Sequence, residues 1–347
     1  KSLFMMATPL GAMDLCQEDS QGNVYEYPAG IAHFLEHKMF EKQDQDIMND
    51  FSALGANVNA FTSYNETAYY FSTTGDIEKP LNLLLDFVQN LDISEESVEK
   101  EKGIINQEIG MYDDDPDWRC YFGSIQNLYQ HHPVKIDIAG TVETVASIDK
   151  ATLEKCYHTF YHPSQMMLFV VGHINPDEIM KLIQDNQQQK HFSKENPIQR
   201  AVVNEPLDVA QKEAVLHMDV TMPKIIVSMK INTILTKPQE RLKRELAMNL
   251  FLDIFFAKSS SLYDEWLNEE LINDSFSAQF TQERDYCFLQ IGGDTLYPEQ
   301  LKEKILYFIE HIHEYDIRQE DFLRLKKKTM GIMISLFNSP ESIANMF

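Results

Sequence analysis

The sequence of 347 residues lacks several features that whole classes of proteins require. It has no apolar run of about 18 residues, the length that a membrane-spanning helix needs, so we expect no membrane segment. Positive charge is in short supply, since 30 Lys and Arg residues against 54 Asp and Glu residues leave a formal net charge of −24. Because this charge would repel phosphate, the composition argues against a nucleic-acid-binding protein.

Cysteine is scarce as well. The four cysteines, at positions 16, 120, 156 and 287, show no Cys-x-x-Cys spacing, so they predict neither a disulfide framework nor a cysteine zinc site. Reduced thiols and the lack of a signal peptide are typical of a cytoplasmic protein, which is the predicted location. The sequence begins at Lys1 without an initiator methionine and stops at Phe347 inside a helical pattern, so we expect both ends to be trimmed or disordered.

Apolar residues, in contrast, are plentiful. They make up 44% of the sequence, which excludes global disorder, and the length suits two domains of ordinary size. Residues 185–206 are polar, rich in Gln and interrupted by Pro197 and Pro206, which indicates a linker. We therefore predict a first domain at residues 1–184 and a second at residues 207–347, the second incomplete at its C-terminus.

The residues that carry chemistry are concentrated at 30–40, Gly-Ile-Ala-His-Phe-Leu-Glu-His-Lys-Met-Phe. This stretch contains His-x-x-Glu-His, the inverted form of the zinc-peptidase helix motif. On a helix, His33 and His37 lie about one turn apart on one side, and Glu36 shares that side. Two imidazoles placed in this way can bind Zn²⁺, with the carboxylate as a base. Histidines with this spacing are also common as ordinary surface or core residues, so the interpretation requires a third, distant ligand.

A candidate for that ligand lies in a second predicted helix at residues 98–111. Glu101 and Glu108 are seven residues, almost two turns, apart and therefore face the same way. Apolar residues at positions 104, 105, 109 and 111 indicate that the helix is partly buried, and a glutamate on such a helix usually has a partner. The alternative, a solvated acidic helix, suits the glutamates nearer its start better than it suits Glu108.

Taken together, these motifs resemble a known family. The 30–40 stretch, the segment Asn-Ala-Phe-Thr at 59–62 and the Glu101/Glu108 pair are similar to pitrilysin, insulin-degrading enzyme and mitochondrial processing peptidase, zinc peptidases with the inverted motif, and most of all to half-length bacterial members. In that family the second glutamate of the pair is the third zinc ligand and the first supports the site from outside. The resemblance thus implies that Glu108 binds the metal and that Glu101 assists.

The family resemblance also implies the fold. It is an α+β architecture of two structurally similar domains, each a mostly antiparallel sheet with helices packed on one face, in which the second domain is a degenerate copy without the metal motif. The local patterns agree, with strands expected at 2–10, 56–62, 66–72 and 166–172 in the first domain. Strands are expected at 213–220, 224–231, 276–282 and 286–292 in the second.

The resemblance further predicts where a substrate binds. In the family, the strand that corresponds to residues 56–62 is an exposed sheet edge beside the zinc, to which a peptide adds as an extra strand. Asn59, Ala60 and Thr62 are the predicted substrate-binding residues on that edge. An ordinary hairpin is the alternative if the metal motif is set aside.

One part of the family pattern is missing. Family members hold their substrate with an Arg and, seven residues further on, a Tyr in the second domain, but the matching positions here carry Trp266 and Asn273. We therefore expect this chain to form a heterodimer with a related, metal-free chain that supplies the Arg-Tyr clamp, although a homodimer is also possible.

The predicted function is a zinc-dependent endopeptidase that cleaves extended peptides or small unfolded polypeptides inside a clamshell chamber. His33, His37 and Glu108 would bind Zn²⁺, Glu36 would act as general base and then general acid, and Glu101 would assist catalysis from beside the ligands. Two alternatives stay open, a non-catalytic scaffold subunit of a peptidase heterodimer and a maturation protease for one dedicated peptide. An intact Glu36 argues against the scaffold, which has no need of a base.

Overall fold

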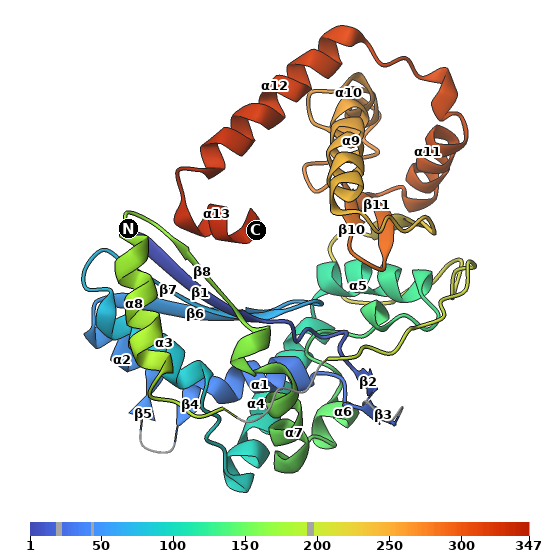
Figure 1. Ribbon diagram of the computed structural model, residues 1–347. Helices are drawn as coiled ribbons and strands as arrows, with labels where there is room; N and C mark the ends of the chain where they lie inside the picture. Colours follow the sequence, from blue (N-terminus) through green and yellow to red (C-terminus); the bar gives the residue numbers. More distant parts are fainter. Residues whose placement is uncertain (19–22, 43–44, 193–197, 347) are drawn as a thin grey trace. The chain divides into compact units, whose positions relative to one another are not determined.

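The computed structural model describes residues 1–18, 23–42, 45–192 and 198–346 (Figure 1). The chain divides into two compact units. Unit 1 consists of Lys1–Met111, Ile136–Val203 and Leu336–Phe347, and unit 2 of Tyr112–Lys135 and Asn204–Ser335. Each unit is a sheet with helices, so the predicted α+β class with two sheet-and-helix units is confirmed. No helix among these described residues is long and apolar enough to cross a membrane.

These units are discontinuous in sequence, unlike the contiguous domains 1–184 and 207–347 that we predicted. Helix α5 (Pro116–Leu128) packs on strand β9 (Lys224–Lys230) of unit 2, and the Tyr129 hydroxyl after it donates to the Cys287 carbonyl at 3.0 Å. Helix α13 (Pro340–Met346) instead packs on the sheet of unit 1. Contacts distant in sequence therefore decide which segment belongs to which unit. Residues 193–197 of the predicted linker lie outside the described residues.

The sheet of unit 1 has four antiparallel strands in the order β6-β7-β1-β8. They are β1 (Ser2–Thr8), β6 (Ala56–Thr62), β7 (Thr67–Thr73) and β8 (Met167–Val171), close to the predicted ranges. Within the described part of the chain, strand β6 pairs with β7 alone and so forms one edge of this sheet. Two short hairpins, β2 (Cys16–Glu18) with β3 (Val24–Glu26) and β4 (Glu41–Lys42) with β5 (Gln45–Asp46), lie outside it.

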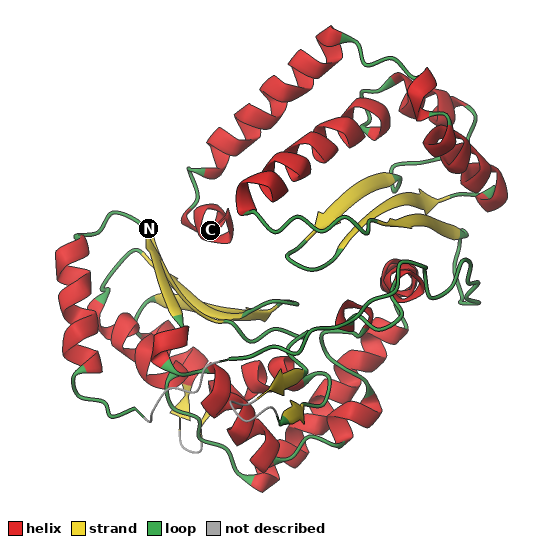
Figure 2. Cartoon of the chain, turned by 45° about the vertical axis from the view of Figure 1, so that its right-hand side comes forward, coloured by secondary structure: helices red, strands yellow, loops and turns green. Residues whose placement is uncertain are grey.

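Helices gather beneath one face of this sheet, as Figures 1 and 2 show. Buried aromatic and aliphatic residues join the two layers, among them Phe4, Phe71 and Leu81. Besides α13, the described residues of this unit form the helices α1 (Ile31–Phe40), α2 (Ile47–Ala53), α3 (Glu78–Val88), α4 (Glu95–Asp113), α6 (Val142–Ala146), α7 (Lys150–Phe160) and α8 (Pro176–Gln187).

Helix α1 is embedded in this core. Its residues Ile31, Ala32, Phe34, Leu35, Lys38 and Met39 are buried, which leaves His33, Glu36 and His37 on the partly exposed side. The helix begins after Gly30, whose φ of 89° is in the left-handed region that favours glycine. A Cβ at Gly30 would lie 2.4 Å from the Ala139 carbonyl oxygen, so the close approach of the two backbones also requires glycine.

Unit 2 contains a three-stranded antiparallel sheet in the order β10-β11-β9, with β10 at Ser277–Gln282 and β11 at Cys287–Asp294. Its core includes Phe256, Trp266 and Phe308. The helices that follow β9 are α9 (Pro238–Phe256), α10 (Ser261–Asn268), α11 (Pro298–Glu310) and α12 (Gln319–Leu336).

The strand predicted at residues 213–220 does not form. This segment has no regular structure, and Val215 and Leu216 are 70% and 50% exposed. Among the described residues, β9 pairs only with β11, so the alternating apolar residues of 213–220 find no ladder partner. The prediction was wrong because alternation alone does not provide the hydrogen bonds that a strand needs.

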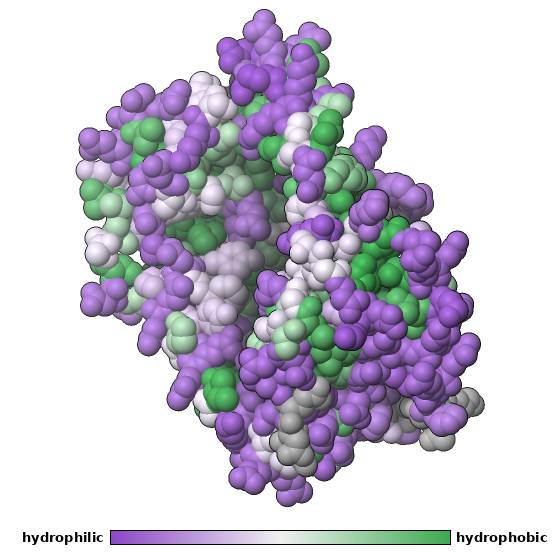
Figure 3. Space-filling model, turned by 90° about the vertical axis from the view of Figure 1, so that its left-hand side faces the viewer, coloured by the Kyte–Doolittle hydropathy of each residue, from purple (hydrophilic) through white to green (hydrophobic). Residues whose placement is uncertain are grey.

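The surface of the molecule is mainly hydrophilic on the face that Figure 3 shows. Apolar residues form scattered groups on this face.

Candidate metal centre

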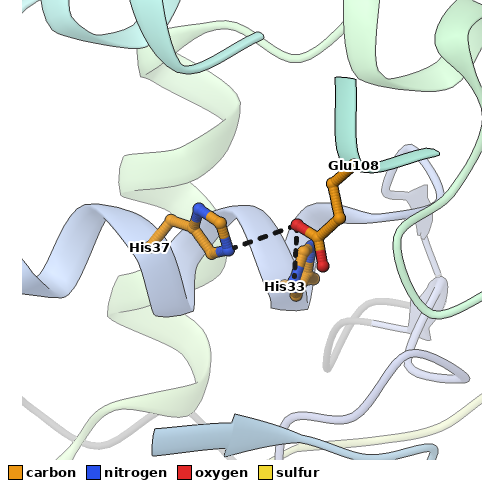
Figure 4. A group of neighbouring side chains, drawn as sticks. All are labelled: His33, His37 and Glu108. Carbon is orange, nitrogen blue, oxygen red and sulfur yellow. Dashed lines mark ion pairs between the residues drawn. The ribbon is translucent and has the colours of Figure 1, made fainter. Parts of the chain in front are cut away.

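Helices α1 and α4 bring three potential metal donors together. The Nε2 atoms of His33 and His37 each lie 3.7 Å from Glu108 Oε2, and the donor atoms of all three residues lie within 4.8 Å of one another. Figure 4 shows both imidazoles projecting from α1 toward the carboxylate that α4 presents. The one-turn spacing in α1 and the crossing of α4 therefore place two nitrogens and one oxygen around a common point.

This donor set fits a zinc ion. Two histidines, one glutamate and an open fourth position are a known ligand set of catalytic zinc sites. Donors about 2.0–2.2 Å from one tetrahedral ion lie about 3.3–3.5 Å from one another, close to the observed separation of 3.7 Å. Small side-chain movements would bring the three donors to bonding distance.

Glu101 contacts the histidine rather than the common point. Its Oε1 lies 2.9 Å from His37 Nδ1, and its Oε2 lies 3.7 Å from the ammonium of Lys38. The structure thus separates the two glutamates of the pair, with Glu108 facing both Nε2 atoms and Glu101 holding one imidazole from behind. The supporting role of Glu101 stays a prediction.

The environment keeps one imidazole neutral and polarises the other. Burial, assisted by the nearby charge of His37, lowers the pKa of His33 to about 4, so His33 is neutral at pH 7 and has a lone pair to offer. Burial also acts to lower the pKa of His37, but the hydrogen bond and charge of Glu101 outweigh it and raise that pKa. For Glu101, the His37 and Lys38 contacts outweigh burial and lower the pKa.

Glu36 stands beside the ligands without joining them. Its Oε2 accepts a hydrogen bond of 2.6 Å from the Thr62 hydroxyl on β6. Burial raises the pKa of Glu36, and the Thr62 hydrogen bond offsets this in part. A carboxylate whose pKa is raised and whose orientation is fixed by a neighbouring strand is suited to accept and return a proton.

The predicted substrate-binding residues lie on β6, but they differ in their contacts. Asn59 is exposed on the edge strand, and its Oδ1 accepts a 2.9 Å hydrogen bond from the backbone amide of Ala60. Thr62, which we predicted to contact substrate, instead has its hydroxyl on Glu36. The structure therefore ties Thr62 to the predicted base, while Asn59 and Ala60 remain on the open edge.

Trp266 and Asn273, which occupy the predicted clamp positions, both contact other residues of unit 2. Trp266 is 1% exposed and lies within the core of unit 2, against Phe256 and Phe276. Asn273 accepts a hydrogen bond from the Ser275 amide at 2.8 Å. Neither side chain offers the guanidinium or phenol that the resemblance led us to look for.

The sequence interpretation did not single out Lys38, and it predicted Thr62 as a substrate-binding residue and not as a partner of Glu36. Lys38 is fully buried beside Glu101, and Thr62 orients Glu36. The pattern from Phe34 to Phe40 does not by itself mark Lys38 as buried, because the polar residues Glu36 and His37 directly precede it. The role of Thr62 depends on how β6 lies against α1, which no local pattern encodes.

An antiparallel sheet that supports a helix with two histidines, a neighbouring carboxylate and a distant glutamate defines the class of inverted-motif metallopeptidase domains. Family models place the chain within that class. Residues 20–142 match the insulinase domain of peptidase family M16, and residues 147–329 match the peptidase M16 inactive domain. The chain belongs to peptidase family M16, the pitrilysin family, and is of its half-length bacterial type.

Relatives of known sequence support this assignment. The chain is 48% identical over 320 residues to YmfH of Bacillus subtilis (strain 168), described as an uncharacterized zinc protease. That match covers 92% of this chain and 74% of the relative. A second zinc protease of the same strain, YmxG, is 34% identical over 161 residues, which cover 44% of this chain and 39% of that relative.

Solved structures also support the assignment to this family. An M16-like peptidase from Alicyclobacillus acidocaldarius is 40% identical, with a TM-score of 0.93 over 99% of this chain and 80% of that one. Pitrilysin shares the fold at 16% identity, with a TM-score of 0.65 over 92% of this chain and 35% of that chain. The chain thus spans 74% of YmfH and 80% of the Alicyclobacillus peptidase.

Proposed function

We propose that this chain is a zinc-dependent endopeptidase that cleaves extended peptides or small unfolded polypeptides. The observation that carries the proposal is the convergence of His33, His37 and Glu108 on one point, with Glu36 oriented beside them. The names of the relatives, which are zinc proteases, support the choice of metal and of reaction.

Each side chain then has a separate role. His33, His37 and Glu108 hold Zn²⁺, which when bound supplies a Lewis acid for the scissile carbonyl and acidifies water. Glu36, oriented by Thr62, accepts a proton from the attacking water and returns it to the leaving amine. Glu101 accepts the Nδ1 proton of His37 and so keeps the Nε2 lone pair directed at the metal.

The substrate would bind as an added strand on β6. Among the residues that the structure describes, this strand has one neighbour in its sheet, so its outer edge has main-chain groups to offer a peptide. The Ala60 amide is engaged by its own Asn59 side chain, which a substrate carbonyl would displace. Recognition through main-chain groups suits a peptidase that accepts extended chains of varied sequence.

A partner chain would complete the enzyme. The clamp positions of the family carry Trp266 and Asn273 here, and Trp266 is buried. Pitrilysin, whose fold this chain shares, has a far longer chain, of which the match covers 35%. We propose a clamshell chamber assembled from this chain and a related, metal-free chain that carries the Arg and Tyr, or from two copies of this chain.

The test combines metal content with peptide cleavage. The purified chain, alone and with a related chain that carries the clamp, is assayed on a quenched peptide library and analysed for zinc. Glu36→Gln keeps the shape of the side chain but removes the base, so turnover should fall by about 100-fold or more while zinc stays bound. Glu108→Gln should weaken zinc binding by about 10-fold or more.

The outcomes separate the possibilities. Near-normal turnover of Glu36→Gln would rule out its role as the base, and full zinc occupancy in Glu108→Gln would exclude Glu108 as a ligand and make Glu101 the next candidate. Zinc binding without cleavage in the presence of the partner would favour the scaffold subunit. Cleavage confined to one or two library members would favour maturation of one dedicated peptide.

A further inference from the structure

Lys38 is a charged residue in an unusual place. It follows His37 directly in α1, and its side chain is 0% exposed. Burying an ammonium without partners costs several kcal/mol or more, so its contacts must compensate for the lost water. They are the carboxylate of Glu41, the Ser97 carbonyl at 3.2 Å and Glu101 Oε2 at 3.7 Å.

These contacts connect Lys38 to the metal centre through a single carboxylate. Glu101 uses both of its oxygens, Oε1 on His37 Nδ1 at 2.9 Å and Oε2 toward Lys38 Nζ at 3.7 Å. A carboxylate held at both ends has a defined rotation about its terminal bond. Removal of Lys38 would leave one end free, and Oε1 would no longer be directed at the imidazole.

The direction of that hydrogen bond matters for metal binding. A carboxylate that accepts the Nδ1 proton leaves the lone pair on Nε2, the atom that faces Glu108. Lys38 also balances charge, since Glu36, Glu101 and Glu108 bring three carboxylates to one small region. Without the ammonium, the buried carboxylate of Glu101 would lose the positive charge beside it and keep its hydrogen bond with His37 Nδ1.

We propose that Lys38 is a positioning residue of the zinc site, which fixes Glu101 on His37 so that His37 presents Nε2 to the metal. This inference rests on the proposed zinc-binding function. In this role Lys38 does not contact the substrate, because its side chain is fully buried.

The direction in which zinc affinity changes when Lys38 is removed distinguishes a positioning effect from a charge effect. Through space alone, removal of a positive charge from beside a cation site strengthens cation binding. Loss of positioning acts in the opposite sense, since changes at residues that support metal ligands typically weaken affinity by about 10–100-fold. Weaker zinc binding on removal of Lys38 therefore reports orientation and cannot come from the lost charge.

The experiment measures zinc affinity by competition with a chromophoric chelator, on the whole chain, without any activity assay. Lys38→Met replaces the ammonium with an apolar side chain of similar length, and we expect zinc affinity to fall by about 10-fold. In the Glu101→Gln background, the same change should have less than about a twofold effect, because Lys38 acts through Glu101. The visible spectrum of the Co²⁺-loaded variant should change as well, since the ligand His37 is reoriented.

Lys102→Met is the matched control. Lys102 adjoins Glu101 in sequence, but it contacts Glu99 and the Ala146 carbonyl, so its loss should leave zinc affinity unchanged. Lys38→Gln, which retains a donor for Glu101, should fall between wild type and Lys38→Met and also serves if Lys38→Met does not fold.

Each outcome of these measurements supports or overturns the positioning role of Lys38. Unchanged or tighter zinc binding in a folded Lys38 variant overturns the proposal, as does an equal loss with and without Glu101. If neither variant folds, Lys38 serves the packing of α1 against α4 and the proposal is also overturned. A wild-type chain that does not bind zinc would refute the proposed function itself, which is a separate result.

Discussion

At the residue scale, three glutamates of similar intrinsic chemistry have three different sets of contacts. Glu108 faces both Nε2 atoms, Glu101 holds His37 from behind, and Glu36 accepts from the Thr62 hydroxyl. These different environments, rather than the residue type, are the basis for the ligand, supporting and general-base roles that we propose for Glu108, Glu101 and Glu36. The Thr62 contact is the most direct of these to test, because it involves a single hydroxyl.

We predict that Thr62→Val lowers kcat by about 10-fold and leaves KM within about twofold. Valine has the shape of threonine but cannot donate, so Glu36 loses its 2.6 Å hydrogen bond and its fixed orientation. Steady-state kinetics on the active assembly, together with zinc analysis, measure the effect. Thr73→Val is the control, since the Thr73 hydroxyl contacts the Gly55 carbonyl at the far end of the β6–β7 pair. If KM rises and kcat stays constant, Thr62 contacts substrate, as the sequence suggested.

At the element scale, a partly buried carboxylate, that of Glu205, connects the segment that follows α5 to the sheet of unit 2. Glu205 accepts hydrogen bonds from the amides of Gln130, His131 and His132 at 2.7–2.9 Å and from Lys230 of β9 at 2.5 Å. This carboxylate therefore helps to hold residues 112–135 in unit 2 although they are distant in sequence. Burial raises the pKa of Glu205, but these donors outweigh it and lower the pKa to about 2.

The lowered pKa predicts a pH dependence of stability. The charged form is favoured in the folded state, so its contribution is fully present above the ordinary pKa of 4.5 and is lost as the pH falls toward about 2. The shift corresponds to about 3 kcal/mol at most. We expect Glu205→Gln to lower the free energy of unfolding of unit 2 by about 2–3 kcal/mol at pH 7 and by much less near pH 3.

Urea unfolding followed by tryptophan fluorescence measures this effect selectively. The two tryptophans of the chain, Trp118 and Trp266, both belong to unit 2. The unfolding is measured with an excess of chelator at every pH, so the release of zinc does not contribute to the pH dependence of stability. The control is Glu213→Gln, which removes an exposed ion pair with Lys302 and should change stability by less than about 1 kcal/mol. An equal loss at pH 3 and pH 7 would show that the Glu205 charge does not contribute.

At the scale of the whole molecule, the question is whether this chain works alone. We predict that the isolated chain binds zinc but cleaves peptides poorly, and that a related chain with the Arg-Tyr clamp restores activity by about 10-fold or more. The physical reason is that substrate must be oriented and water excluded before the preorganised groups act fully. Light scattering gives the mass in solution, and the assay is repeated at several ratios of the two chains. Full activity as a monomer would disprove the proposed dimer.

The sequence by itself determined the features that depend on short spacings. His33, Glu36 and His37 share one side of α1 because a helical turn fixes their relation, and the β6–β7 hairpin follows from alternation within about 17 residues. The family and its fold could be identified from these motifs together with the Glu101/Glu108 pair. The role of each glutamate of that pair came from the resemblance, because seven-residue spacing directs both to the same side of α4.

Only the tertiary structure decided what distant segments do to one another. His37 and Glu101 are 64 positions apart, and Glu36 and Thr62 are 26 apart, so their contacts depend on how α1 lies against α4 and β6. The assignment of residues 112–135 to unit 2 likewise depends on contacts of Tyr129 and Glu205 far along the chain. Helix and hairpin patterns arise from local backbone geometry, whereas pairings between elements are selected by burial and hydrogen bonding over the whole fold. For that reason the motif could be predicted, while the burial of Lys38 and the contact of Thr62 required the structure.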